Sequence, residues 1–125
     1  MAKQQQKPTD AELEILGTLW ETGPATVRQV HDQLSQSRDV GYTTVLKLMQ
    51  IMMEKGLVVR DETNRSHLYR ARRREEVTQK QLVTDLVKRA FGGSTEKLVM
   101  RALSAKKTTR EEIAQIRKML DELED

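Results

Sequence analysis

Apolar residues recur at helical spacing through the first part of the chain and predict a series of short helices. The first apolar stripe consists of Leu13, Ile15, Leu16, Leu19 and Trp20. Thr9 and Glu12 form a capping box before this stripe, and Gly23 ends the helix. A second capping box, Thr26 with Gln29, opens a shorter helix. Its apolar face consists of Val27, Val30 and Leu34.

The clearest stripe belongs to a third helix, which we expect at about residues 42–55. A polar loop at 35–41 precedes it, and Gly56 suits the position just past its end. The stripe consists of Val45, Leu48, Met49, Met52 and Met53.

The hydrophobic period then changes from helical to alternating. The segment 57–60 is short, with the β-branched Val58 and Val59 at its centre. Residues 61–66 are polar and rich in turn formers, and 67–72 alternate, with Tyr69 opposite Leu68 and Arg70. This pattern predicts an antiparallel hairpin.

From residue 75 onward, the sequence predicts helices only. One covers 77–90, with Val83 and Val87 on its stripe, and 91–94 breaks it at two glycines. A second begins near Thr95, and a capping box of Thr109 and Glu112 opens the last one. We therefore expect a mostly α-helical chain with one small hairpin. It would comprise a disordered tail at 1–8, a winged helix-turn-helix domain at 9–74 and a helical dimerisation domain at 75–125.

In so small a chain, little else can cover the apolar stripes of the last three helices. This favours packing of these helices between two copies of the chain over packing within one chain. The candidate dimer contacts are Leu82, Leu86, Leu98, Leu103, Ile113, Ile116 and Leu120.

Charge is unevenly distributed along the chain. The formal net charge is +3, and residues 1–74 carry all of this excess. Residues 55–74 alone hold seven basic side chains against Asp61 and Glu62. A local patch of this sign suits a polyanion, although an ordinary solvated face is equally compatible with it.

The composition excludes several other classes. The chain has no cysteine, which excludes disulfides, thiolate metal sites and a cysteine nucleophile. Its N-terminal residues lack the apolar core of a signal peptide, and no apolar run could span a membrane. No catalytic motif is present, and His31 and His67 are more simply solvated or hydrogen-bonded residues than metal ligands. We expect a cytoplasmic non-enzyme without metal, cofactor or membrane contact.

The outer face of the third helix carries the candidate chemistry. Thr43, Thr44, Lys47 and Gln50 lie opposite the apolar stripe, and such hydroxyl, amino and amide groups can contact base edges or phosphates. The same threonines could instead cap the helix. Arg65 lies at the hairpin tip, where it could reach a phosphate or a narrow minor groove. Residues 72–74 could serve as a hinge or contact DNA. The candidate DNA-contacting residues are Arg28, Tyr42, Thr43, Thr44, Lys47, Gln50 and Arg65.

Several motifs resemble the penicillinase repressor family, which includes methicillin-resistance and copper-responsive repressors. The similar stretches lie at 13–27, 42–45, 48–49, 55–58, 67–69 and 111–120. The resemblance implies a homodimer on a palindromic DNA operator, with contacts from Thr43, Thr44 and Lys47 and with dimerisation by the C-terminal helices.

Two branches of that family carry regulatory features that this chain lacks. The β-lactam-responsive members are cleaved by a protease at an Asn-Phe bond, whereas this chain has Ser94 followed by Thr95. The copper-responsive members have a cysteine-rich tail. A regulatory protease or another inducer therefore remains open as a partner. The alternative function is a winged-helix adaptor that binds proteins, of which exposed Leu46 and Ile51 would be the only signs.

Overall fold

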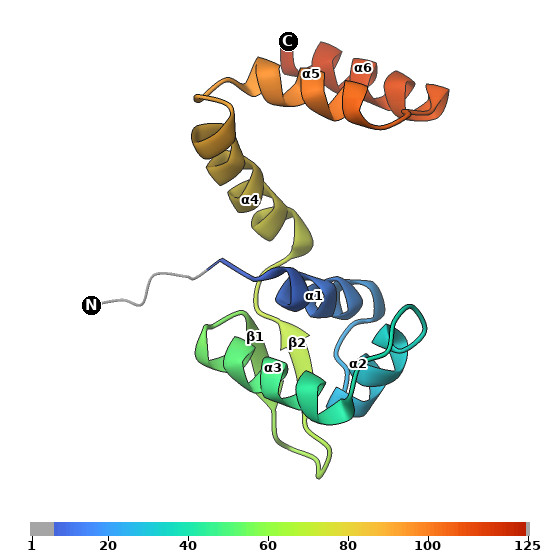
Figure 1. Cartoon of the computed structure of the whole chain (residues 1–125), viewed down its shortest axis with the longest axis vertical. Helices are drawn as coiled ribbons and strands as arrows, with labels where there is room; N and C mark the ends of the chain where they lie inside the picture. The colour runs from blue at the N-terminus through green and yellow to red at the C-terminus, as the bar shows by residue number, and fades with distance from the viewer. Residues whose placement is uncertain (1–6, 125) are drawn as a thin grey trace, which may run out of the picture. The chain divides into compact units, whose positions relative to one another are not determined.

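The computed structural model describes residues 7–124, so most of the expected disordered tail at 1–8 lies outside the described residues. Three helices and a hairpin come first: α1 (Asp10–Thr22), α2 (Val27–Leu34), α3 (Tyr42–Glu54), β1 (Val58–Asp61) and β2 (Leu68–Ala71). Three further helices follow: α4 (Glu75–Ala90), α5 (Thr95–Ala105) and α6 (Arg110–Glu124) (Figure 1). The expected fold class, mostly helical with a winged helix at the N-terminal end, is confirmed.

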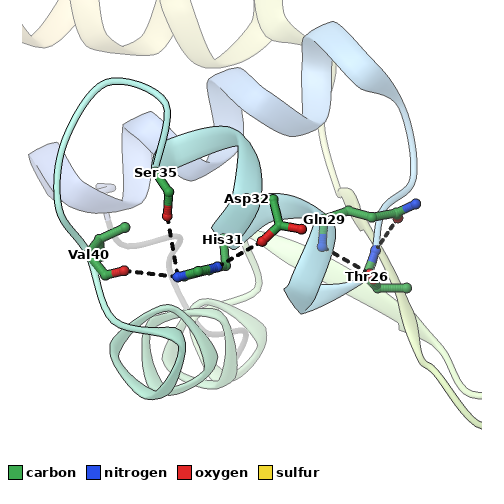
Figure 2. A network of polar contacts seen from close by, with 6 residues as sticks. All are labelled: Thr26, Gln29, His31, Asp32, Ser35 and Val40. Atoms are coloured by element: carbon green, nitrogen blue, oxygen red, sulfur yellow. Dashed lines mark hydrogen bonds and ion pairs between the residues drawn. The ribbon is translucent and has the colours of Figure 1, made fainter.

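The helix boundaries follow from local capping. The Thr9 hydroxyl accepts from the Glu12 N–H at 3.2 Å, and the Glu12 carboxylate accepts from the Thr9 N–H at 2.9 Å. Thr26 and Gln29 form the same reciprocal pair before α2 (Figure 2). Gly56, at φ 79°, follows α3 in the left-handed region that favours glycine. The predicted caps are therefore confirmed.

The sheet has one pairing that the sequence pattern did not predict. β1 and β2 are antiparallel, with Val58 opposite Ala71 and Asp61 opposite Leu68. Ala25 adds an isolated bridge to Tyr69, through N–H to O distances of 2.8 and 2.9 Å in the two directions. The segment before α2 thus pairs with β2 and holds the hairpin against the first two helices.

The core of the winged helix lies between α1, α2, α3 and the hairpin. Ile15, Val30, Val45, Met49 and Met52 are completely buried. The predicted stripe of α3 is confirmed as the buried side of that helix, although Leu48 and Met53 are only half-buried at its margins.

The chain divides into two units inside α4, between Leu82 and Val83, whereas the predicted domains meet at residues 74 and 75. Two features place the start of α4 with the first unit. The Trp20 indole donates from Nε1 to the Arg73 carbonyl at 2.9 Å, and Thr78 is buried.

Candidate nucleic-acid interface

The outer face of α3 is exposed and polar. Thr43, Thr44, Lys47 and Gln50 are all exposed, and they lie opposite the buried Val45 and Met49. Among residues 7–124, Lys47 has no ion-pair partner. The helix therefore presents hydroxyl, amino and amide groups to any ligand that lies along it.

The threonines do not cap α3. Gly41 is the N-cap residue and has no side-chain cap hydrogen bond. Its carbonyl accepts from the Val45 N–H at 3.2 Å. The capping role considered for Thr43 and Thr44 is therefore wrong.

Arg28 and Tyr42 meet at the start of α3. The Arg28 guanidinium carbon lies 4.7 Å from the centre of the Tyr42 ring, which is a cation–π contact. The His31 ring approaches Tyr42 edge-on, with centres 6.0 Å apart. These contacts hold a cation from α2 beside the first residue of α3.

The wing is ordered by its own polar contacts. Arg60 donates from Nε to the Glu62 carboxylate at 2.7 Å and from Nη1 to the Tyr69 hydroxyl at 3.5 Å. The hydrogen bond to the Tyr69 hydroxyl raises the pKa of Arg60 most, and the hydrogen bond to the Glu62 carboxylate raises it further. Arg60 is thus held within the wing, whereas Arg65 is exposed in its loop and has no ion-pair partner among the described residues.

A second contact closes the turn of the wing. The Asp61 carboxylate accepts from the Thr63 hydroxyl at 2.5 Å and from the Thr63 N–H at 2.9 Å. These hydrogen bonds, the one from the hydroxyl above all, lower the pKa of Asp61. The ionised carboxylate therefore stabilises the turn that precedes Arg65.

A cleft of about 390 Å³ separates the wing from α2 and α3. It brings together four of the predicted DNA-contacting residues, and the other three lie along the outer face of α3. An anion such as a phosphate would suit a cleft with three arginines at its walls. Its polar and charged lining includes Arg28, Tyr42, Gln50, Arg60, Arg65 and His67.

A long-range ion pair fixes the other end of α3. Lys55, at the C-cap of that helix, donates from Nζ to the Glu12 carboxylate at 2.5 Å. The same carboxylate caps α1. The sequence predicts only the cap, because nothing in the local pattern links two residues that lie 43 positions apart.

The segment 72–74 leads directly into α4. The Arg73 carbonyl accepts from Trp20, and the Arg74 carbonyl accepts from the N–H groups of Val77 and Thr78 at 3.1 and 3.3 Å. Arg72 and Arg74 are exposed.

The second unit exposes its apolar residues. Within the described part of the chain, neither α5 nor α6 contains a buried residue. Leu120 is 53% and Leu123 76% exposed. The candidate dimer residues are all half-buried or exposed: Leu82, Leu98, Ile113 and Ile116 are half-buried, and Leu86, Leu103 and Leu120 are exposed.

Residues 7–124 contain no group of three metal-ligating side chains. Each helix within residues 7–124 is too short or too polar to span a lipid bilayer.

A three-helix core with a two-stranded wing behind it defines the class of a winged helix-turn-helix protein. The chain belongs to the penicillinase repressor family, whose model matches residues 8–122. The members of this family are repressors, which are transcriptional regulators and not enzymes.

Two kinds of individual protein are similar to parts of this chain. The chain is 44% identical over 61 residues to the transcriptional regulator BlaI of two Mycobacterium tuberculosis strains. This match covers 48% of the chain and 44% of each relative. The fold is similar to a solution structure of monomeric Bacillus licheniformis BlaI in complex with the blaP half-operator. That likeness has a TM-score of 0.51 and 21% identity, and it covers 60% of this chain and 92% of that one.

Proposed function

We propose that this protein is a DNA-binding repressor that works as a homodimer on a palindromic operator. The outer face of α3 would enter the major groove, and the wing would contact the backbone. The observation that carries this proposal is the exposed polar face of α3, whose threonines are not used as caps and which lies beside a cleft with three arginines. Membership of a repressor family supports the sign of regulation. Such a regulator would act in the cytoplasm, beside its DNA.

Each part of the surface has its own role in this proposal. Thr43, Thr44, Lys47 and Gln50 would contact base edges or nearby phosphates, and Arg65 would contact the backbone. Arg28 and Tyr42, which stack at the start of α3, would position the helix on the duplex. An adaptor would need an apolar patch on this surface. Leu46 packs against the core, however, and the large apolar residues that α3 exposes are Tyr42, whose ring carries the Arg28 guanidinium, and Ile51.

The experiment is selection of bound sequences from random duplex DNA by the full chain, followed by gel shifts. We expect an enriched palindrome whose half-sites lie about 34–36 Å apart or a multiple of that distance. Arg65→Ala should weaken binding to all sequences and reduce its salt dependence. Failure to enrich any sequence would refute the proposal.

Dimerisation is proposed through α4, α5 and α6. These helices carry apolar side chains that stay exposed in a single chain, including Leu86, Leu103 and Leu120. A second copy would cover them. Leu120→Asp should give monomers in sedimentation velocity, with Glu124→Asp as a control on the same helix. A persistent dimer would place the interface elsewhere.

The switch that relieves repression is proposed to act at the break between α4 and α5. Gly92 and Gly93 are exposed there. A protease or a ligand that acts on this segment would separate the dimer halves and lower DNA affinity. Cutting an introduced protease site at 92–93 should convert dimers to monomers, and a cut dimer that stays intact would exclude this position.

A further inference from the structure

The cleft between the wing, α2 and α3 has a positively charged lining. Among the described residues, its walls include Arg28, Arg60 and Arg65 but no aspartate or glutamate. Arg28 lies against the Tyr42 ring and Arg65 is exposed, and neither has an ion-pair partner within residues 7–124. These two arginines therefore keep their full positive charge toward any group that enters the cleft.

Arg60 differs from the other two arginines, because a carboxylate already balances its charge. The Glu62 carboxylate accepts from Nε of Arg60 at 2.7 Å and also forms an ion pair with Nη2. The third nitrogen, Nη1, donates to the Tyr69 hydroxyl at 3.5 Å. Nη1 and Nη2 each carry a second N–H, so the guanidinium keeps two donors for a further acceptor. The pair as a whole, however, is neutral.

The position of the cleft fits one strand of a duplex backbone. If α3 enters the major groove and the wing contacts the backbone, the sugar–phosphate strand that bounds this groove passes between them. The loop between β1 and β2 projects past α3 (Figure 1), and the cleft lies between these two parts of the molecule. The phosphates of that strand therefore meet the three arginines.

We propose that this cleft binds one backbone phosphate of the duplex, with Arg60 as a ligand beside Arg28 and Arg65, and that Glu62 competes with the phosphate for Arg60. This inference rests on the proposed DNA-binding function. The Glu62 side chain is 55% exposed and can turn into solvent, whereas Arg60, at 24%, stays at the cleft wall. An exposed ion pair contributes little, and a charge-assisted hydrogen bond to phosphate is stronger. Arg60 therefore changes partner when the phosphate enters.

Glu62 then sets how tightly a duplex is held and not which sequence is read. Phosphate contacts are the same for every sequence, so a change at Glu62 alters the affinities for operator and random duplexes alike. Glu62→Gln removes the counter-charge of Arg60 and should raise both affinities by about two- to fivefold, because breaking an exposed ion pair costs no more than that. Arg60→Met, which keeps an unbranched apolar stem beside the Tyr69 ring, should lower both.

The measurement is fluorescence anisotropy of the full chain with the selected operator and with a random duplex, at one salt concentration. A gain in Glu62→Gln could also come from the general field of one carboxylate near DNA. Glu54→Gln is the matched control, because Glu54 is exposed at the end of α3 and has no ion-pair partner in the part of the chain that the structure describes.

The double variant of Glu62→Gln with Arg60→Met separates competition from the general field. The gain should be larger in Glu62→Gln than in Glu54→Gln, and it should vanish in the double variant relative to Arg60→Met alone. A gain that persists beside Arg60→Met, or equal gains in the two glutamine variants, would overturn the competition. A loss of affinity in Glu62→Gln would overturn it as well.

A probe without DNA separates this proposal from the proposed function. Inorganic pyrophosphate, titrated into the free protein, should shift the Nε–H resonances of Arg28 and Arg65. The resonance of Arg60 should shift at lower pyrophosphate concentration in Glu62→Gln than in the wild type. Resonances that do not respond would overturn the phosphate site. A response to pyrophosphate in a protein that binds neither duplex would refute the proposed function and the duplex as ligand, and would leave the anion site and the competition by Glu62 intact.

Discussion

Glu12→Gln should destabilise the winged helix by about 3 kcal/mol, the lower end of the range for breaking a buried ion pair. The side chains of Glu12 and Lys55 are 3% and 14% exposed, so the substitution leaves an ammonium group largely shielded from water. The lower end applies because Lys55 keeps a contact with the Lys7 carbonyl at 3.3 Å. The glutamine oxygen can still accept from the Thr9 N–H, so the cap of α1 is retained.

The assay is urea unfolding at a fixed protein concentration, because dimerisation would couple stability to concentration. Glu14→Gln is a control on the same helix. Glu14 pairs with Arg38 at 3.1 Å, but these side chains are 42% and 44% exposed, so its loss should cost less than about 1 kcal/mol.

A double-mutant cycle completes this test. Lys55→Met alone should also be costly, since it leaves the Glu12 carboxylate buried without a counter-charge. The double variant with Glu12→Gln should recover much of the loss, because neither charge then remains. Equal losses for Glu12→Gln and Glu14→Gln, or additive losses in the cycle, would refute the reasoning.

Three further predictions concern the rest of the winged helix. In thermal unfolding, Gly56→Ala should lower the free energy of unfolding by roughly 1–2 kcal/mol, because an L-residue is strained at φ 79°. Gly17→Ala, inside α1 with open space around a new Cβ, should instead raise it by about 0.8–1.0 kcal/mol. Equal effects of the two substitutions would contradict the left-handed conformation of Gly56. Trp20→Phe should lower the free energy of unfolding by about 1 kcal/mol, because it removes the hydrogen bond to the Arg73 carbonyl. An unchanged free energy of unfolding would show that this bond does not fix the segment before α4. Because the pKa of Asp61 is lowered, its turn is stable at pH values above the ordinary pKa of about 3.9 and opens as pH falls through the lowered pKa. The amide resonance of Thr63 should therefore shift in acid in the wild type and should not shift in Asp61→Asn.

Local signals in the sequence predicted most of the secondary structure. The capping boxes at Thr9, Thr26 and Thr109 each join residues three positions apart, so both partners can be recognised in one short stretch of sequence. The boundaries differ slightly where a longer contact intervenes. β1 begins at Val58, one residue later than expected, because the Leu57 N–H bonds to the Met52 carbonyl at the end of α3.

The contacts that position the candidate site could not be predicted in this way. The pairs Glu12–Lys55, Trp20–Arg73 and Ala25–Tyr69 join residues that lie far apart along the chain. Hydrophobic periodicity identifies the outer face of α3 but carries no information on which distant residue meets it. The role of that face in reading DNA remains a prediction.

The most direct test of the central claim is the ratio of operator affinity to random-duplex affinity, measured for the wild type, Lys47→Ala and Arg65→Ala at one salt concentration. If α3 reads the operator, Lys47→Ala should lower operator affinity by about 1–3 kcal/mol and reduce the ratio. Arg65→Ala should weaken both affinities and leave the ratio unchanged. A ratio that is unchanged in Lys47→Ala but collapses in Arg65→Ala would contradict the account.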